Sequence, residues 1–308
     1  MAATQPVRVI YVAGYGRSGS TILDIALGQH PDVFGAGEIT ALTRHVWEQN
    51  EYCACGQPVQ HCQFWPAVMQ QWLRRRPESA LGDYAASQEK FESLSGLARS
   101  MAGVGQGSQF AIYARQTRLL FDEVLSRSGK RAIVDSSKLP GRAMALAHIP
   151  DIDLRIVHLV RDGRGVAWSL AKAYGRDAKS GLQREIKPKS ASRTALRWTT
   201  VNLATEYLAG KLGRDRVLRV RYEDFASDPA ETLREIGSFA GLDLGETGER
   251  LKRGDPVRPS HQIAGNRLRM STAISVAKDE AWRSMMPRGQ QAAFHRLGGW
   301  MLRRYGYC

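Results

Sequence analysis

Short runs of β-branched and apolar residues recur along the chain and predict buried strands. They are VRVIYVA (7–13), KRAIVDSSK (130–138), DIDLRIVHLV (151–160) and DRVLRVRYEDF (215–225), with a short strand or turn in DVFGAGEI that ends at Glu38. Between them, STILDIALGQHP and DPAETLREIGSFAGL carry apolar residues at helical spacing. Strands that alternate with helices predict a three-layer α/β fold with a mostly parallel central sheet.

Residues 63–128 differ from the rest because their pattern is mostly helical and carries no strong motif. We therefore predict one domain over residues 1–308, with a mainly helical insertion around residues 50–130. No apolar run approaches the length of about 18 residues that a membrane span needs. The N-terminal run is short and interrupted by Arg8, so we expect a cytoplasmic protein without a signal peptide or transmembrane segment.

The 308 residues carry a formal net charge of +14. This balance favours an anionic partner, such as a nucleic acid or a phosphorylated small molecule, although an arginine-rich surface would give the same count. The chain has no recognised nucleic-acid-binding module, so a basic nucleic-acid-binding protein is kept as an alternative and no nucleic-acid partner is expected.

The segment GYGRSGST (14–21) has the spacing of a phosphate-binding P-loop with one departure. Gly14, Gly19 and Thr21 match a Walker A loop, but Ser20 stands where the lysine belongs. The cation is Arg17, inside the loop, and the nearest approach to a Walker B acid is Asp135. These features favour a ligand with a shorter phosphate chain than ATP and no required metal; a P-loop kinase-like nucleotide enzyme is the alternative.

A second basic element, VRDGRGVAWS (160–169), also follows a predicted strand. Arg161 leaves the strand and Ser169 lies one to two turns into the next helix, so the two side chains could bind a separate phosphate. Arg164 is nearby but could face solvent. Because ligands of parallel sheets bind beyond the carboxyl ends of the strands, one ligand could contact both elements.

The two phosphate elements, in this order, resemble those of the sulfotransferases that use 3′-phosphoadenosine 5′-phosphosulfate (PAPS). VRYEDF and SHQIAGNRLRM also resemble family segments, and the short motifs are closest to carbohydrate and tyrosylprotein sulfotransferases. The resemblance runs from about Val7 to Trp282, with residues 50–130 unmatched. It implies the sulfotransferase fold, which is related to nucleoside kinases, and metal-independent transfer of the sulfuryl group from PAPS to an acceptor hydroxyl, releasing adenosine 3′,5′-bisphosphate.

The resemblance assigns donor-binding roles residue by residue. The loop residues implied to hold the 5′-phosphosulfate are Gly16, Arg17, Ser18, Gly19, Ser20 and Thr21. Arg161 and Ser169 would hold the 3′-phosphate. Tyr222 would contact adenine, or is a core tyrosine, and Arg267 and Arg269 would lie in a loop that covers the donor, or are inert exposed arginines.

The same resemblance assigns catalytic roles to Glu38, Lys138 and Arg17. Glu38 would act as the base for the acceptor hydroxyl, and Lys138 would stabilise charge on the leaving phosphate oxygen. Asp135, His158 and His261 are lesser candidates for the base. His158 lies in mid-strand, which favours a core histidine.

The sequence leaves two further questions open. Cys53, Cys55 and Cys62, with His61 beside them, could bind zinc, form a disulfide or stay reduced. The acceptor could be a small molecule, a glycan, a lipid or a peptide tyrosine, and the oligomeric state cannot be read. The insertion region holds aromatic residues that would form an apolar acceptor pocket or simply a core: Trp47, Tyr52, Phe64, Trp65 and Trp72.

Overall fold

Strands and helices alternate along the chain, as the apolar pattern predicts. The computed structural model describes residues 6–75, 81–103 and 107–307. The strands are β1 (Val7–Ala13), β2 (Val33–Gly35), β3 (Ala132–Lys138), β4 (Ile152–Val160) and β5 (Val217–Arg221). The α-helices are α1 (Ser20–Leu27), α2 (Trp65–Arg74), α3 (Leu81–Glu92), α4 (Leu94–Met101), α5 (Ser108–Ser128), α6 (Pro140–Ala147), α7 (Gly163–Leu170), α8 (Ala191–Leu212), α9 (Tyr222–Ser227), α10 (Pro229–Ala240), α11 (Gly245–Lys252), α12 (Trp282–Met285) and α13 (Arg288–Arg304). Shorter helical turns are η1 (Ile39–Ala41), η2 (Leu42–Trp47), η3 (Val59–His61) and η4 (Arg267–Met270).

The strands form one sheet in the order β2-β3-β1-β4-β5, and each of the four described pairings is parallel. The chain therefore starts at the centre of the sheet and builds outwards in both directions. All carboxyl ends of the strands lie at the same edge, which is where ligands of such sheets bind.

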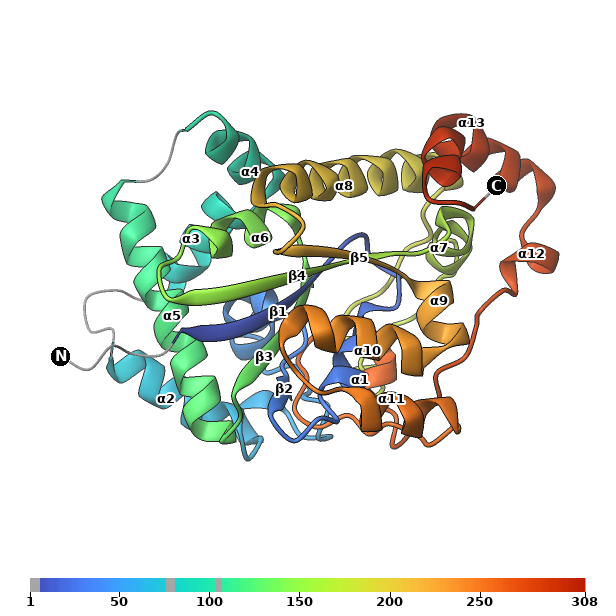
Figure 1. The fold of residues 1–308 in the computed structure, drawn as a ribbon. Coiled ribbons are helices and arrows are strands. Elements are labelled where there is room, and N and C mark those ends of the chain that lie inside the picture. The colour runs from blue at the N-terminus through green and yellow to red at the C-terminus, as the bar shows by residue number, and fades with distance from the viewer. Residues whose placement is uncertain (1–5, 76–80, 104–106, 308) are drawn as a thin grey trace.

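Helices cover both faces of the sheet (Figure 1). Successive side chains of β1 point to opposite faces, and the packing follows this alternation. Val9 and Tyr11 join a core with α2 to α6, whereas Ile10 and Val12 pack with α1 and α9 to α11. The predicted three-layer α/β fold with a parallel sheet is confirmed.

The described part of residues 50–130 contains α2 to α5 and packs against the sheet through a shared core. Trp65 and Trp72 are completely buried in that core and Phe64 nearly so, so these aromatic side chains are structural and do not form an apolar acceptor pocket. The single-domain organisation over residues 1–308 stays a prediction.

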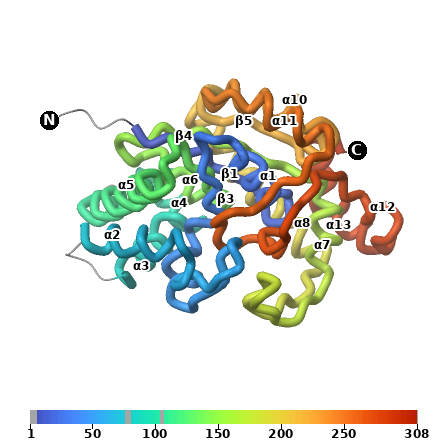
Figure 2. The backbone as a smooth tube through the Cα atoms, turned by 90° about the horizontal axis from the view of Figure 1, so that it is seen from below, coloured from blue at the N-terminus to red at the C-terminus, as the bar shows by residue number. Residues whose placement is uncertain are grey.

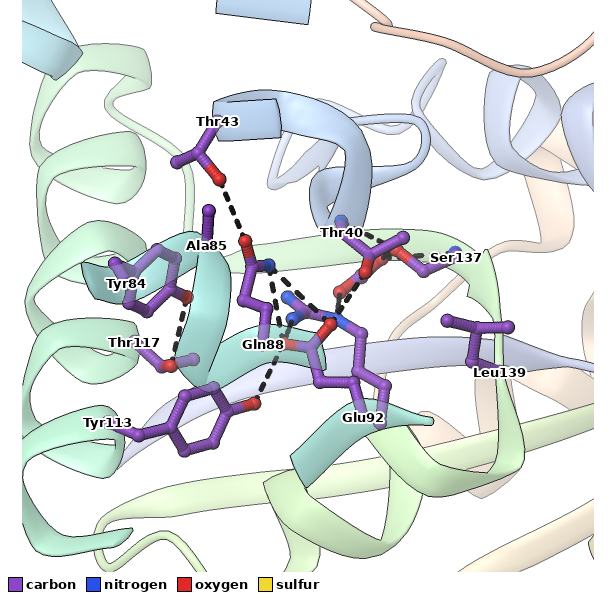
Figure 3. Close-up of polar contacts among 12 residues, drawn as sticks. Thr40, Thr43, Tyr84, Ala85, Gln88, Glu92, Tyr113, Thr117, Ser137 and Leu139 are labelled. Atoms are coloured by element: carbon purple, nitrogen blue, oxygen red, sulfur yellow. Dashed lines mark hydrogen bonds and ion pairs between the residues drawn. The ribbon is translucent and has the colours of Figure 1, made fainter. Parts of the chain in front are cut away.

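A buried ionic cluster joins this insertion to the sheet (Figure 3). Arg142 of α6 is fully buried and donates to Asp135 of β3 at 2.7 Å and to Glu92 of α3. Glu92 also accepts hydrogen bonds from Tyr113 of α5 at 2.9 Å and from Thr40 at 2.6 Å. Burial works to lower the pKa of Arg142, but the carboxylates outweigh it and raise that pKa well above its usual value. The guanidinium is therefore a permanent buried cation that fixes the insertion helices against β3.

Candidate functional site

Every described strand of the sheet contributes one residue to a single cavity at its carboxyl edge. Arg17 follows β1, Glu38 follows β2, Lys138 ends β3, Arg161 follows β4 and Tyr222 follows β5. The cavity has a volume of about 380 Å³, which lies in the range of small-molecule sites. The topology thus gathers residues that are more than 200 positions apart in sequence.

The loop between β1 and α1 has a backbone that depends on two glycines. Gly14 and Gly19 have φ angles of +139° and +92°, in the region that side-chain-bearing residues rarely adopt. A Cβ on Gly14 would lie 2.4 Å from the carbonyl oxygen of Leu159, and one on Gly19 would lie 2.4 Å from the ring of Tyr222. By contrast, Gly16 has no protein atom within 4 Å of its would-be Cβ. Steric need therefore explains Gly14 and Gly19, while close approach of an anion to Gly16 stays a prediction.

Helix α1 begins directly at Ser20, and no side chain caps its N-terminus. The first N–H groups of a helix lack partners within the helix and carry the positive end of its dipole, so they favour an anion. Four other loop residues line the cavity with Ser20: Gly16, Arg17, Gly19 and Thr21. Ser18 differs from them because it is buried and lies outside the cavity wall, so its hydroxyl is not presented to a ligand.

Arg17 is a partly desolvated cation within the loop. It adopts a left-handed conformation (φ +69°), and burial lowers the pKa of its guanidinium. Among the described residues it forms no ion pair. A cation of this kind gains more from a bound anion than a solvated surface arginine would.

Arg161 lines the same cavity, where its nearly buried side chain holds several parts of the site. It donates to the carbonyl oxygen of Arg17 at 3.1 Å and to the Asp279 carboxylate at 2.9 Å, and it lies 4.6 Å from the centre of the Tyr222 ring. Burial works to raise the pKa of Asp279, but Arg161 outweighs it and lowers that pKa. Ser169 lies on the same cavity wall, so Arg161 and Ser169 are brought together as predicted.

Arg164, from the same turn, does not line this cavity. It is mostly buried and pairs with Asp162 and with the carbonyl oxygen of Tyr307, each at 2.7 Å, instead of facing solvent. It serves to fix the turn after β4.

Glu38 and Lys138 form an ion pair of 2.5 Å inside the cavity. Lys138 has a positive φ of +72° and donates to the carbonyl oxygen of Ser136 at 3.1 Å. The P-loop has a serine in place of its lysine, but Lys138 supplies an ammonium group to the same cavity from the neighbouring strand. A base and a cation, at contact distance and partly shielded from water, can move a proton and stabilise a developing negative charge.

Two lesser candidates for the base lie away from the cavity wall. Asp135 is fully buried and bonded to Arg142 and Ser137, so it is held in the ionic cluster. His158 is buried against Asn202 at 2.9 Å, and burial lowers its pKa to about 4. It is the neutral core histidine that its mid-strand position favours.

The segment from His261 to Met270, here called the strap, crosses beside the residues that follow β2 (Figure 2). Glu38 N–H donates to the carbonyl oxygen of Ile263 at 2.9 Å, and Asn266 N–H donates to the Thr21 hydroxyl at 3.2 Å. Gly265, Asn266 and Leu268 line the cavity. The predicted covering segment is therefore present, but its contacts come from residues other than its arginines.

Of the two arginines of the strap, Arg267 is exposed as expected, whereas the expectation of an exposed loop arginine is wrong for Arg269. Arg269 is fully buried and donates to the carbonyl oxygens of Tyr52 (3.3 Å) and Gly265 (3.4 Å), so it holds the backbone. Arg267 lies over the Tyr174 ring at 4.9 Å. Neither forms part of the donor-side cavity wall. Sequence reasoning missed Asn266 and Asp279, although Asn266 lies within the quoted SHQIAGNRLRM segment.

A second cavity of about 260 Å³ adjoins the first. The two share Arg17, Glu38, Gly265 and Asn266. Its remaining wall is mixed: it has polar or charged side chains from His45, Glu51, Tyr174, Gln183, Arg184, Arg267 and Arg269, and apolar ones from Ala41, Leu182, Ile186 and Ala264. Glu38 thus stands at the junction of the two cavities.

The fold and the site together define an α/β protein whose cavity places a phosphate-loop-like segment beside an acidic and a basic side chain. Residues 9–246 match the model of the sulfotransferase family, and the chain belongs to this family. Curated relatives include carbohydrate sulfotransferase 5 of Mus musculus (31% identical over 168 residues) and carbohydrate sulfotransferase 3 of Homo sapiens (28% over 173 residues). These matches cover 51% and 53% of this chain, but 42% and 35% of the relatives. The chain thus spans less than half the length of these relatives.

Solved structures show the same fold. The sulfotransferase domain of the Synechococcus PCC 7002 olefin synthase matches with a TM-score of 0.50 and 22% identity, covering 98% of this chain and 96% of that one. The sulfotransferase domain of the curacin biosynthetic pathway gives 0.53 and 14%, covering 97% and 98%. The predicted family and fold are both confirmed.

Proposed function

We propose that this chain transfers the sulfuryl group from PAPS to an acceptor hydroxyl and releases adenosine 3′,5′-bisphosphate. The observation that carries the proposal is the single cavity into which the five strands deliver a lysine-free phosphate loop, Arg161 with Ser169, and the Glu38–Lys138 pair. A donor with two separate phosphate groups needs two anion sites, and the cavity offers the phosphate loop with Arg17 as one and Arg161 with Ser169 as the other.

In the proposed reaction, Glu38 accepts the proton of the acceptor hydroxyl as its oxygen attacks sulfur. The new O–S bond forms while the bond from sulfur to the 5′-phosphate oxygen breaks. The negative charge that develops on that oxygen is stabilised by Lys138 and by Arg17. Lys138 is paired with Glu38 before the donor binds. When the donor is bound, the ammonium group of Lys138 would interact with both the Glu38 carboxylate and the leaving oxygen. These cations let us propose a transfer that needs no metal.

The kinase-like alternative has less support from the site. A Walker A threonine helps to hold Mg²⁺, but the Thr21 hydroxyl already accepts the N–H of Asn266. Asp135, the nearest Walker B candidate, is bound to Arg142 in the buried ionic cluster. A basic nucleic-acid-binding function rests on net charge alone.

For the acceptor, we propose a polar molecule such as a glycan, bound in the second cavity. That cavity meets the first at Glu38, where the base must contact the hydroxyl, and its mixed wall carries several hydrogen-bonding and charged side chains, among them Glu51, Gln183 and Arg184. The curated relatives are carbohydrate sulfotransferases, which supports the same class. Within the described residues no helix has the length and apolarity to cross a membrane, and a cytoplasmic location stays a prediction.

The test is calorimetric binding of adenosine 3′,5′-bisphosphate, compared with AMP and with ATP plus Mg²⁺, followed by turnover of PAPS with glycan and phenol acceptors. We expect the bisphosphate to bind much more tightly than AMP, which lacks the 3′-phosphate, and glycans to be preferred over phenols. Preference for ATP with Mg²⁺ would support the kinase-like alternative. Steeply salt-dependent binding of DNA or RNA would support a nucleic-acid-binding function.

A further inference from the structure

Three cysteines and one histidine meet at a point outside the proposed catalytic cavity. Cys53, Cys55 and Cys62 come from the segment around η3, and His261 comes from the strap, 208 positions after Cys53. Their four potential ligand atoms all lie within 4.8 Å of one another. Cys53 and Cys62 are buried and His261 is half-buried, while Cys55 faces the surface.

The distances among Cys53, Cys62 and His261 are those of a tetrahedral metal site, and the Cys55 sulfur lies within 4.8 Å of each of these atoms. The sulfur atoms of Cys53 and Cys62 are 3.7 Å apart, and they lie 3.7 Å and 3.3 Å from Nδ1 of His261. A zinc ion with Zn–S bonds of about 2.3 Å and a Zn–N bond of about 2.0 Å places tetrahedral ligands about 3.8 Å (S to S) and about 3.5 Å (S to N) apart. A disulfide would need its sulfurs at about 2.05 Å, and all three cysteines are free thiols in this structure.

The surroundings orient these side chains as a metal site requires. The His261 ring stacks on Phe64 with ring centres 5.3 Å apart, and its main-chain oxygen accepts the indole N–H of Trp65 at 2.8 Å. The backbone N–H of Phe64 donates to the Cys62 sulfur at 3.4 Å. N–H donors and packed rings of this kind orient the side chains that bind the metal directly, and an N–H donor stabilises a thiolate.

We propose that Cys53, Cys55, Cys62 and His261 bind a structural Zn²⁺ ion. Three thiolates and one imidazole form a ligand set that zinc prefers, and four protein ligands leave no open position for catalysis. His261 supplies the nitrogen ligand, whereas His61, the neighbour of Cys62 in sequence, is exposed and outside the cluster. The ion would be separate from sulfuryl transfer, which the proposed mechanism carries without a metal.

The ion would anchor the strap that lines the donor cavity. Next to His261, Gln262 accepts the N–H of Ala54 at 3.0 Å, and Ile263 bonds with Ala36 and Glu38 on the other side. Gly265 and Asn266 reach the cavity wall within five residues of His261. Zinc binding itself does not depend on the proposed function; its effect on the donor cavity does.

The test begins with the metal content of the full chain, purified under reducing conditions and measured by mass spectrometry of the elements. We expect about one zinc per chain, lost in Cys62→Ser and His261→Ala and kept in the matched control His61→Ala. A wild-type chain that takes up no zinc when offered a slight excess, or one whose metal survives His261→Ala, would overturn the ligand assignment. A Cys53–Cys62 disulfide in the freshly purified protein would do the same.

Because the variants could fail to fold, a second measurement uses the wild-type chain with Co²⁺ in place of zinc. Intense visible bands of tetrahedral cobalt, with charge-transfer absorption for three thiolates, are expected; a weak octahedral spectrum would contradict the site. Removal of the metal should also weaken binding of adenosine 3′,5′-bisphosphate. A zinc-containing protein whose bisphosphate affinity is unchanged by metal removal would retain the site but refute its role in holding the strap.

Discussion

Arg161→Ala is the sharpest test of the donor site, because this side chain supports both the cavity and its proposed ligand. Its side chain is about 8% exposed. The guanidinium donates hydrogen bonds to the carbonyl oxygen of Arg17 and to the Asp279 carboxylate, and it packs over the Tyr222 ring. A charge-assisted hydrogen bond to a phosphate is worth roughly 1.5–3 kcal/mol, which predicts a dissociation constant for adenosine 3′,5′-bisphosphate raised roughly 10- to 150-fold. The freed Asp279 carboxylate would repel the same phosphate, so the lower value is a minimum.

Titration calorimetry measures this effect, and two further variants identify its cause. Arg234→Ala removes an exposed arginine of α10 that does not line the cavity, so its affinity should stay within about threefold of wild type. The double variant Arg161→Ala/Asp279→Asn removes the freed carboxylate and should recover part of the loss. Thermal unfolding of each variant separates weak binding from poor folding. A folded Arg161→Ala protein with wild-type affinity would refute the assignment of the 3′-phosphate site.

Three other predictions test the rest of the site. Glu38→Gln should keep bisphosphate affinity and lose PAPS turnover by at least a hundredfold, the usual scale of general-base catalysis; an active variant would move the base elsewhere. Gly19→Ala should lower both stability and donor affinity, since its methyl group would meet the Tyr222 ring, whereas Gly16→Ala should leave the unfolding temperature unchanged; equal stabilities would contradict the argument. Burial raises the pKa of Asp24 to about 7 and lowers that of His158 to about 4, so between about pH 4 and 6.5 Asp24 makes stability fall as pH rises and His158 makes it rise. Asp24→Asn should remove the contribution of Asp24, which is worth up to about 4 kcal/mol over three pH units. Urea unfolding at both ends of the pH range should then show that the stability of the variant rises more steeply with pH than that of the wild-type protein. An unchanged pH dependence of stability would refute the assignment to Asp24.

Local sequence predicted the sheet well because each strand carries its own signal. The β-branched runs that end in Ala13, Lys138 and Val160 are mostly buried, and the edge run that ends in Arg221 buries Val220. Since parallel strands end at one edge, the polar residues that follow them were expected to meet, and Arg17, Glu38, Lys138, Arg161 and Tyr222 do so. Periodicity and topology were sufficient for this part.

Long-range pairings could not be predicted, because no local pattern marks them. Arg269 resembles a solvated loop arginine until its burial against the carbonyl oxygens of Tyr52 and Gly265 is known. The sequence left zinc, a disulfide and free thiols open for the three cysteines, and their neighbour in sequence, His61, is not the histidine that faces the sulfurs, which is His261. Asp24 accepts the N–H of Gly37 at 3.0 Å and so positions the segment that carries Glu38. In the sequence this role is marked only by an acidic residue within the otherwise apolar helix STILDIAL.

The Arg142 cluster has a consequence for anyone who wishes to exchange the helical insertion between family members by building chimeras. The natural cut would replace the helical insertion and keep the sheet with its donor site. Such a cut removes Glu92 and Tyr113 while Arg142 and Asp135 remain, and an incompletely paired buried charge costs roughly 3–5 kcal/mol. A working graft must therefore carry its own carboxylate at the position of Glu92, or replace Arg142 and Asp135 together with an apolar pair.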